Sequence, residues 1–197
     1  MKYRTICCAL ALVVVSALPS VAGDKYTIDA GHSSVTFSVK HMVISNVKGS
    51  FQKFEGAIVY DAKNMTASSV EFSIQTASID TNNEKRDVDL RKNDFLDAEN
   101  HPAITFKSEK VVKKGEGWMA VGKLTIRGVS KEIELPFAVN GPIQNPWGQT
   151  VIGVDVGSIT INRQDYGVTW NKKMDNGGLI VGDEVTIEIQ VEAKMSS

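Results

Sequence analysis

The sequence predicts an all-β fold, either a sandwich or a closed barrel, with one short helix beside the strands. Apolar side chains alternate with polar ones through most of the chain after residue 24, which is typical of antiparallel strands with one buried face. Turn-forming groups such as Asn140-Gly141-Pro142 separate these stretches. One charge-dense stretch, residues 81–94, lacks the alternation. About eight or nine strands at this spacing favour a sandwich or a barrel.

The first 22 residues have the pattern of a secretory signal peptide. Lys2 and Arg4 precede an apolar run over residues 6–18, and Ser20-Val21-Ala22 offers small residues at a cleavage site. The run is shorter than the ~20 apolar residues that a spanning helix needs, which favours cleavage after Ala22 over an uncleaved anchor. We therefore expect an exported protein whose folded part, residues 23–197, is one domain.

The expected strands follow in chain order, each marked by apolar residues two positions apart. The first alternates Val35, Phe37 and Val39 with serine, threonine and lysine. The others cover residues 54–60, 70–74, 104–106, 124–126, 133–139, 154–161 and 185–191. Side chains at even spacing share one face of a strand, so each stretch has a dry face and a wet face.

Residues 81–94, with the sequence TNNEKRDVDLRKND, are expected to contain the helix. Thr81 or Asn82 would cap it, and the helix would cover residues 84–93. Its charges alternate in sign, which fits a solvent-exposed helix with weak surface ion pairs. The alternative is a lid or rim whose arginines bind an anionic or polar head group.

Charge and cysteine content exclude several classes of protein. The chain has 22 basic and 23 acidic residues, and loss of Lys2 and Arg4 with the signal peptide makes the remainder more acidic. Without a run of basic residues, nucleic-acid binding is not expected. Both cysteines, Cys7 and Cys8, lie in the apolar run. Cleavage would therefore leave no disulfide, thiolate metal site or cysteine nucleophile.

The three histidines do not have the spacing of a metal or catalytic site. His32 and His41 are nine residues apart, so in an unbroken strand they face opposite sides and lie about 30 Å apart. His101 precedes Pro102 in an expected loop. The sequence also lacks the Gly-x-Ser-x-Gly, His-Glu-x-x-His and P-loop patterns. We predict no metal, no cofactor and no catalysis.

The dry strand faces are the decisive feature. An eight-stranded closed barrel is either filled by side chains or holds one small ligand, and alternation alone does not distinguish the two. An apolar interior favours a hydrophobic chain over a sugar or nucleotide. The candidate interior residues are Val35, Phe37, Val39, Phe51, Phe72, Ile74, Phe106, Phe137 and Trp170.

Several blocks resemble the YceI-like, polyisoprenoid-binding family. They are SIDTNNEKRDVDLRKNDFLDAENHPAITFKS (78–108), GKLTIRGVSKEIELPF (122–137) and INRQDYGVTW (161–170), preceded by HSSVTFSVKH and GSFQKFEGAIVYD. The resemblance covers nearly all of the chain after residue 22. One departure is Asp89, which stands where the family often has histidine.

The resemblance implies an extended eight-stranded antiparallel lipocalin-like β-barrel with a helix against it, exported to the periplasm. Its tunnel would hold an isoprenoid or similar long-chain amphiphile, since each methylene buried there contributes ~0.8 kcal/mol to the binding free energy. No stable membrane insertion is expected. The sequence does not decide whether two chains form a homodimer. Polar residues at the mouth of the tunnel would determine which lipid head group is bound. The candidates are His32, His41, Arg86, Arg91, Asn162 and Arg163.

Two other functions stay open at this point. A barrel filled by its own side chains would suit a stress-related interaction module that binds a partner protein. A barrel enzyme acting on a bound lipid would need a histidine or carboxylate for acid–base work, and the spacing of these residues does not favour it.

Overall fold

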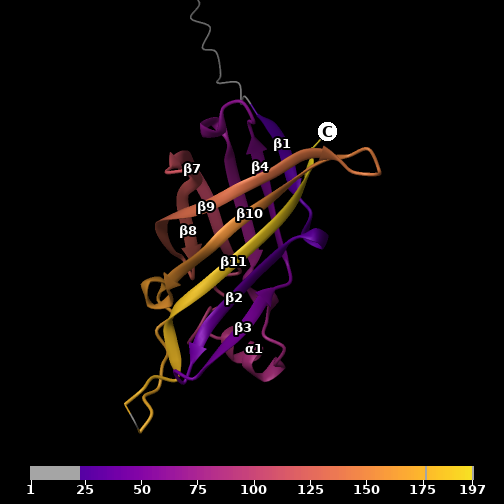
Figure 1. Cartoon of the computed structure of the whole chain (residues 1–197). Coiled ribbons are helices and arrows are strands. Elements are labelled where there is room, and N and C mark those ends of the chain that lie inside the picture. Colours follow the sequence, from indigo (N-terminus) through magenta and orange to yellow (C-terminus); the bar gives the residue numbers. More distant parts are fainter. Residues whose placement is uncertain (1–22, 176, 197) are drawn as a thin grey trace, which may run out of the picture.

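The structure is a computed structural model that describes residues 23–175 and 177–196, and it is dominated by eleven strands (Figure 1). The predicted signal peptide, residues 1–22, lies outside the described residues. The strands are β1 (Asp24–Ile28), β2 (Ser34–His41), β3 (Ser45–Phe51), β4 (Phe54–Tyr60), β5 (Ser69–Gln75), β6 (Ile79–Asp80), β7 (Ala103–Lys114), β8 (Gly117–Ile126), β9 (Val129–Gln144), β10 (Thr150–Asn162) and β11 (Val181–Met195). The helix is α1 (Glu84–Leu90), and short 3-10 turns are η1 (Ala30–His32), η2 (Met65–Ala67), η3 (Thr76–Ser78) and η4 (Arg163–Tyr166).

Eight of the strands close into a ring, all with antiparallel pairing. Their order is β1-β4-β5-β7-β8-β9-β10-β11, and the ring closes because β1 also pairs with β11, with Ile28 opposite Ala193. This confirms the predicted eight-stranded barrel and decides against a sandwich. A closed ring leaves these strands without a free edge, which stabilises a β-protein against edge-to-edge association.

The other three strands lengthen the barrel at one end. β11 pairs with β1 near its C-terminal end and with β2 along its N-terminal part, where Ile187 lies opposite Phe37. The chain passes from β1 to β2 through η1, where the Asp29 side chain accepts a hydrogen bond from the Gly31 N–H at 3.1 Å. β3 and the two-residue β6 continue from β2. Figure 1 shows β1 and β4 toward one end and β2, β3 and α1 at the other.

The alternation seen in the sequence corresponds to burial in the structure. In β7, Ile104 and Phe106 are buried and Lys107 is exposed. Two clusters of buried apolar side chains form on the inner side of the barrel wall, one around Phe106 and Tyr166 and the other around Tyr26 and Ile152. Burial of this kind is the main stabilising contribution in a domain held together without disulfides.

The helix is shorter than predicted and has a different cap. Asn83, not Thr81 or Asn82, accepts a hydrogen bond from the Arg86 N–H at 3.1 Å, and the helix ends at Leu90. Thr81 is instead buried, and its hydroxyl donates to the Asp87 carboxylate at 2.6 Å. After Leu90 the chain turns back on itself, so that the Leu96 N–H donates to the Leu90 carbonyl and regular helix cannot continue to residue 93.

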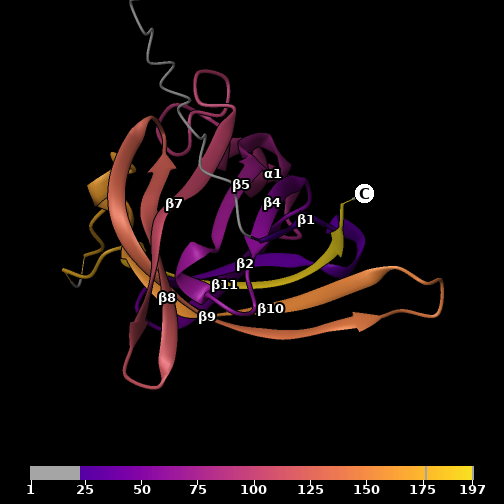
Figure 2. The same ribbon diagram turned by 90° about the horizontal axis from the view of Figure 1, so that it is seen from above.

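The β9–β10 hairpin projects beyond the barrel as an arm (Figure 2). At its tip the Asn145 side-chain oxygen accepts from the Trp147 and Gln149 N–H groups, at 3.1 and 3.0 Å, and fixes the turn. Trp147 is 81% exposed there. Within residues 23–175 and 177–196, no helix has both the length and the apolar character needed to cross a bilayer.

Candidate ligand-binding site

A cavity of about 180 Å³ lies inside the end of the barrel that β2, β3 and α1 complete. Seven of the predicted interior residues line it: Val35, Phe37, Val39, Phe51, Phe72, Ile74 and Phe106. Their common feature is an inward position on alternating strands, which is the property that the sequence pattern encodes.

Phe37 shows how the strands make room for large rings in this cavity. It lies opposite Gly49 on the neighbouring strand β3, and a Cβ at residue 49 would be only 2.5 Å from the Phe37 ring. The glycine therefore provides the space that the ring occupies. Phe51, two residues along β3, packs against the same ring with centroids 5.8 Å apart.

The lining of this cavity is almost entirely apolar. Among the residues that line it, only Thr36, Thr105, Arg163 and Tyr166 have polar side-chain atoms. The segment that contains and follows α1 contributes Leu90, Phe95 and Leu96. The helix region therefore closes one end of the cavity with apolar side chains, whereas its charges remain outside.

A second cavity of about 90 Å³ continues the interior toward the other end of the barrel. Phe137, another predicted interior residue, lines this cavity and not the first. Four residues line both cavities: Phe72, Phe106, Leu135 and Ile189. The apolar interior is thus divided into two compartments that meet at these side chains.

Trp170 departs from its predicted interior position. It lines neither cavity, is 38% exposed, and packs against Phe95 with ring centroids 5.1 Å apart. The physical reason is local, because β10 ends at Asn162 and the chain then forms η4 and a left-handed turn at Gly167. Inward and outward alternation holds only within a strand, so it did not apply to Trp170.

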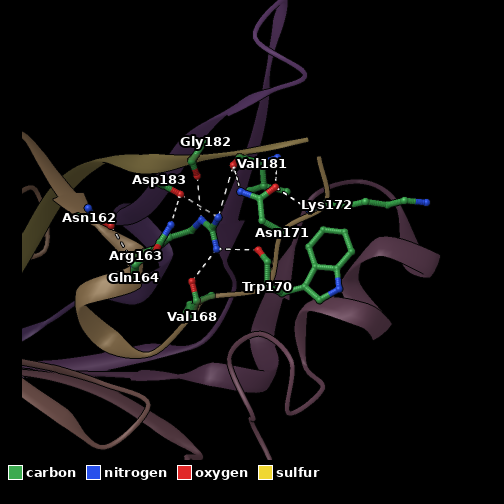
Figure 3. Close-up of polar contacts among 10 residues, drawn as sticks. All are labelled: Asn162, Arg163, Gln164, Val168, Trp170, Asn171, Lys172, Val181, Gly182 and Asp183. Atoms are coloured by element: carbon green, nitrogen blue, oxygen red, sulfur yellow. Dashed lines mark hydrogen bonds and ion pairs between the residues drawn. The ribbon is translucent and has the colours of Figure 1, made fainter. Parts of the chain in front are cut away.

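Arg163 lines the first cavity, but its hydrogen-bonding capacity is used within the protein (Figure 3). Its five N–H groups donate to the carbonyls of Val168, Trp170, Val181 and Gly182 and to the Asp183 carboxylate, over 2.6–3.4 Å. A guanidinium has five N–H donors. Arg163 therefore has no N–H group left over for the lipid head group that it was predicted to bind.

Burial lowers the pKa of Arg163, and the nearby Asp183 carboxylate opposes this shift. The residue is 6% exposed, and its ion pair with Asp183 spans 3.1 Å. The buried positive charge is thus paired. Asn162 has a local role, because its side chain accepts from the Gln164 N–H at 2.9 Å and caps η4.

The two histidines proposed for the head group lie outside both cavity linings. His32 is on the surface, with its Nδ1 atom 2.8 Å from Asp29 Oδ2. The hydrogen bond to Asp29 raises the pKa of His32, and the bonds from Lys194 and then His32 hold the pKa of Asp29 well below its usual range. His41 ends β2 opposite Val181, one of the lining residues.

Asp29, His32 and Glu192 have ligand atoms within 4.8 Å of one another, which is the spacing of a metal site. However, the Lys194 ammonium lies 2.6 Å from Asp29 Oδ2. A cation already sits beside this carboxylate and would repel a metal ion. We interpret the group as an ion cluster at the passage from β1 to β2.

Arg86 and Arg91 hold the helix against the barrel. Arg86 donates through Nε and Nη2 to the Thr81 hydroxyl and carbonyl, at 2.7 and 3.0 Å. Arg91 donates to the carbonyls of Ala77 and Ile79, at 2.8 and 2.9 Å. Neither residue lines either of the two cavities described above. Sequence reasoning placed them at a rim because it could not identify these backbone acceptors.

The structure also adds lining residues that sequence reasoning missed. Leu90, Phe95 and Leu96 come from a segment that lacks strand alternation, and Val168 follows a turn. The available signal was that Leu90 and the pair Phe95-Leu96 are apolar residues within a charged segment, a pattern that indicates one-sided packing. The combined site is an apolar space inside the barrel with paired charge at its edge, suited to burying a hydrocarbon chain.

The fold and interior define an antiparallel β-barrel with a divided apolar cavity. The model of the YceI-like domain matches residues 26–193. UPF0312 proteins are 36% identical over 173 residues in Staphylococcus aureus strain N315 and 37% identical over 169 residues in Staphylococcus epidermidis. These alignments cover 87% and 85% of the chain and 98% and 96% of the relatives. The chain belongs to the YceI-like family.

Solved structures have the same architecture. BcnA of Burkholderia cenocepacia is 25% identical, with a TM-score of 0.73, over 84% of this chain and 98% of BcnA. The YCEI protein of Campylobacter jejuni is 32% identical, with a TM-score of 0.67, over 80% of this chain and 90% of its own. A polyisoprenoid binding domain from Saccharophagus degradans, at 15% identity and a TM-score of 0.66, covers 87% of this chain and 98% of that domain, a likeness of fold.

Proposed function

We propose that the protein binds an isoprenoid lipid or a similar long-chain amphiphile inside its barrel, without catalysis. The observation that carries this proposal is the apolar lining of two adjoining cavities, in which the one charged side chain, Arg163, is bonded within the protein. An apolar chain needs no specific polar partner, because burial of its methylenes supplies the binding free energy at ~0.8 kcal/mol each. Membership of the YceI-like family supports the same ligand class.

The proposed setting is the periplasm, where the protein would act as a carrier. The support is the signal-peptide pattern of residues 1–22, which predicts export. A long-chain lipid is nearly insoluble in water, and a closed barrel would shield its chain between membranes. The head group would remain near the barrel mouth, where the ligand leaves the apolar lining.

The direct test is extraction of the protein purified from its own cells into organic solvent, followed by mass spectrometry. A long-chain prenyl lipid at near-stoichiometric amount is expected. Native mass spectrometry of the intact protein should show the same mass bound. A well-folded protein that neither carries nor takes up such a lipid would rule out this function.

The packed-barrel alternative is distinguished by Phe37→Trp. If the interior holds a ligand, the larger ring lowers lipid uptake, and the free energy of unfolding of the lipid-free protein stays nearly unchanged. If the interior is packed, overpacking should cost about 1–3 kcal/mol. Lys48→Trp on the exposed face of β3 is the matched control, because it adds the same ring outside the cavity. Lipid extraction and urea unfolding measure the two quantities.

A further inference from the structure

The two cavities share four lining residues that come from different parts of the barrel wall. Phe72 lies on β5, Phe106 on β7, Leu135 on β9 and Ile189 on β11. These strands are spread around the closed ring of eight. Because each residue lines both compartments, the four side chains lie between them. We call this set the dividing ring.

Within the dividing ring, Phe72 has the largest side chain that is only partly buried. Phe106 and Leu135 are buried, with 6% and 7% exposure, so neighbouring atoms already surround them. Phe72 and Ile189 are only partly buried. Phe72 has the larger side chain of these two, so it obstructs the passage more.

Neighbouring residues set the position of the Phe72 ring. Phe54 stacks on it, with centroids 5.6 Å apart and planes at 27°. Gly56 lies opposite Phe72 on β4, and a Cβ there would come within 3.1 Å of the ring. Phe106 faces it from β7. The phenyl group is therefore supported from both neighbouring strands.

We propose that the dividing ring, through Phe72, determines the length of prenyl chain that the barrel accepts. This inference rests on the proposed function and specifies its ligand. A chain that fills the first cavity stops at Phe72, and additional isoprene units gain burial only if they pass the ring into the second cavity. In the wild-type protein, isoprene units beyond the first cavity therefore add less to the binding free energy than those within it, because Phe72 narrows the passage into the second cavity.

The test compares the affinities of farnesol and solanesol, a short and a long prenol, in the same detergent. Phe72→Ala should join the cavities and raise the affinity for solanesol relative to farnesol by about tenfold or more. Phe51→Ala is the matched control, because Phe51 lines only the first cavity. It should leave this ratio unchanged. Phe72→Trp should lower the ratio below that of the wild type.

The outcomes separate the two proposals. If the wild-type protein binds neither prenol, the proposed function fails and the length inference fails with it. If it binds prenol but Phe72→Ala and Phe51→Ala give the same ratio, the length inference alone is overturned. Circular dichroism checks the fold of each variant. Should Phe72→Ala not fold, an unchanged ratio in Phe72→Trp overturns the inference and a lowered ratio supports it.

Discussion

Arg163 connects three backbone segments through one planar side chain. It extends from η4 and donates to the carbonyls of Val168, Trp170, Val181 and Gly182, so it fixes the chain that leads from β10 into β11. A guanidinium suits this position because its rigid fork offers five donors in one plane. The sequence shows an arginine after a strand, but its acceptors come from residues whose path depends on the whole fold. Its burial was therefore not predictable from spacing.

Arg163→Lys should destabilise the protein by about 3 kcal/mol, although the charge is kept. An ammonium has three donors and cannot reach the same set of carbonyls, so buried acceptors lose their partners. The measurement is urea unfolding at neutral pH. Arg86→Lys is the matched control, since Arg86 makes two bonds at a partly buried site, and a loss below about 1 kcal/mol is expected there. Equal losses in both variants would contradict the role assigned to Arg163.

His32 should titrate above its ordinary pKa of 6.5, because its imidazolium is bonded to the Asp29 carboxylate. A raised pKa in the folded state means that this contact stabilises the fold at pH values below the unfolded pKa. The contribution disappears as pH rises through the folded pKa. NMR titration of the His32 ring protons measures the shift. Asp29→Asn should return the pKa toward 6.5, and an unchanged pKa in this variant would assign the shift to another group.

The strand β2 shows what alternation can and cannot specify about an element. Val35, Phe37 and Val39 were placed inside the barrel by their even spacing, and all three line the first cavity. The same spacing gave no indication that Gly49 across the strand pair leaves room for Phe37. Residues beyond strand ends, such as Trp170, escape the rule altogether. Element interiors were thus predictable, and the cavity boundaries, formed by loops and α1, were not.

Gly49→Ala should destabilise the β2–β3 pair and reduce lipid uptake. The new Cβ would lie 2.5 Å from Phe37 Cζ, so the ring must move into the cavity, with an expected cost of about 1–3 kcal/mol. Gly153→Ala in β10 is the control, because the nearest atom to its Cβ is 3.7 Å away and a change below about 0.5 kcal/mol is expected. Thermal unfolding and prenol binding report the two effects. Equal behaviour of both variants would refute the fit of Phe37 to Gly49.

At the scale of the whole molecule, closure depends on one long strand, β11, which pairs with β10 along one side and with β1 and β2 along the other. β11 pairs with β1 to close the ring and with β2 to lengthen it, and the barrel interior contains two adjoining cavities. The antiparallel pairing follows from alternation and turns, but the eight or nine strands expected from the sequence are fewer than the eleven found among the described residues, because the short strands β1, β3 and β6 were not among the predicted ranges. Which strands meet, and whether inward side chains fill the space, depend on the volumes of residues distant in sequence. Alternation alone therefore left a sandwich, a packed barrel and a hollow barrel as alternatives.

The hollow interior leads to a prediction for the whole molecule, namely that stability depends on ligand. A ligand that binds only the folded state stabilises it by about 2.7 kcal/mol at a hundred times its Kd. For a domain of this size each kcal/mol shifts Tm by about 2–4 °C. Removal of lipid should therefore lower Tm by about 5–10 °C, and added farnesol should restore it. Differential scanning calorimetry measures both steps, with isopentenol as the control that has the same hydroxyl but little chain to bury. Recovery of Tm with isopentenol would assign the effect to the head group. An unchanged Tm after complete delipidation would contradict the prediction, because the barrel would then be equally stable without a ligand.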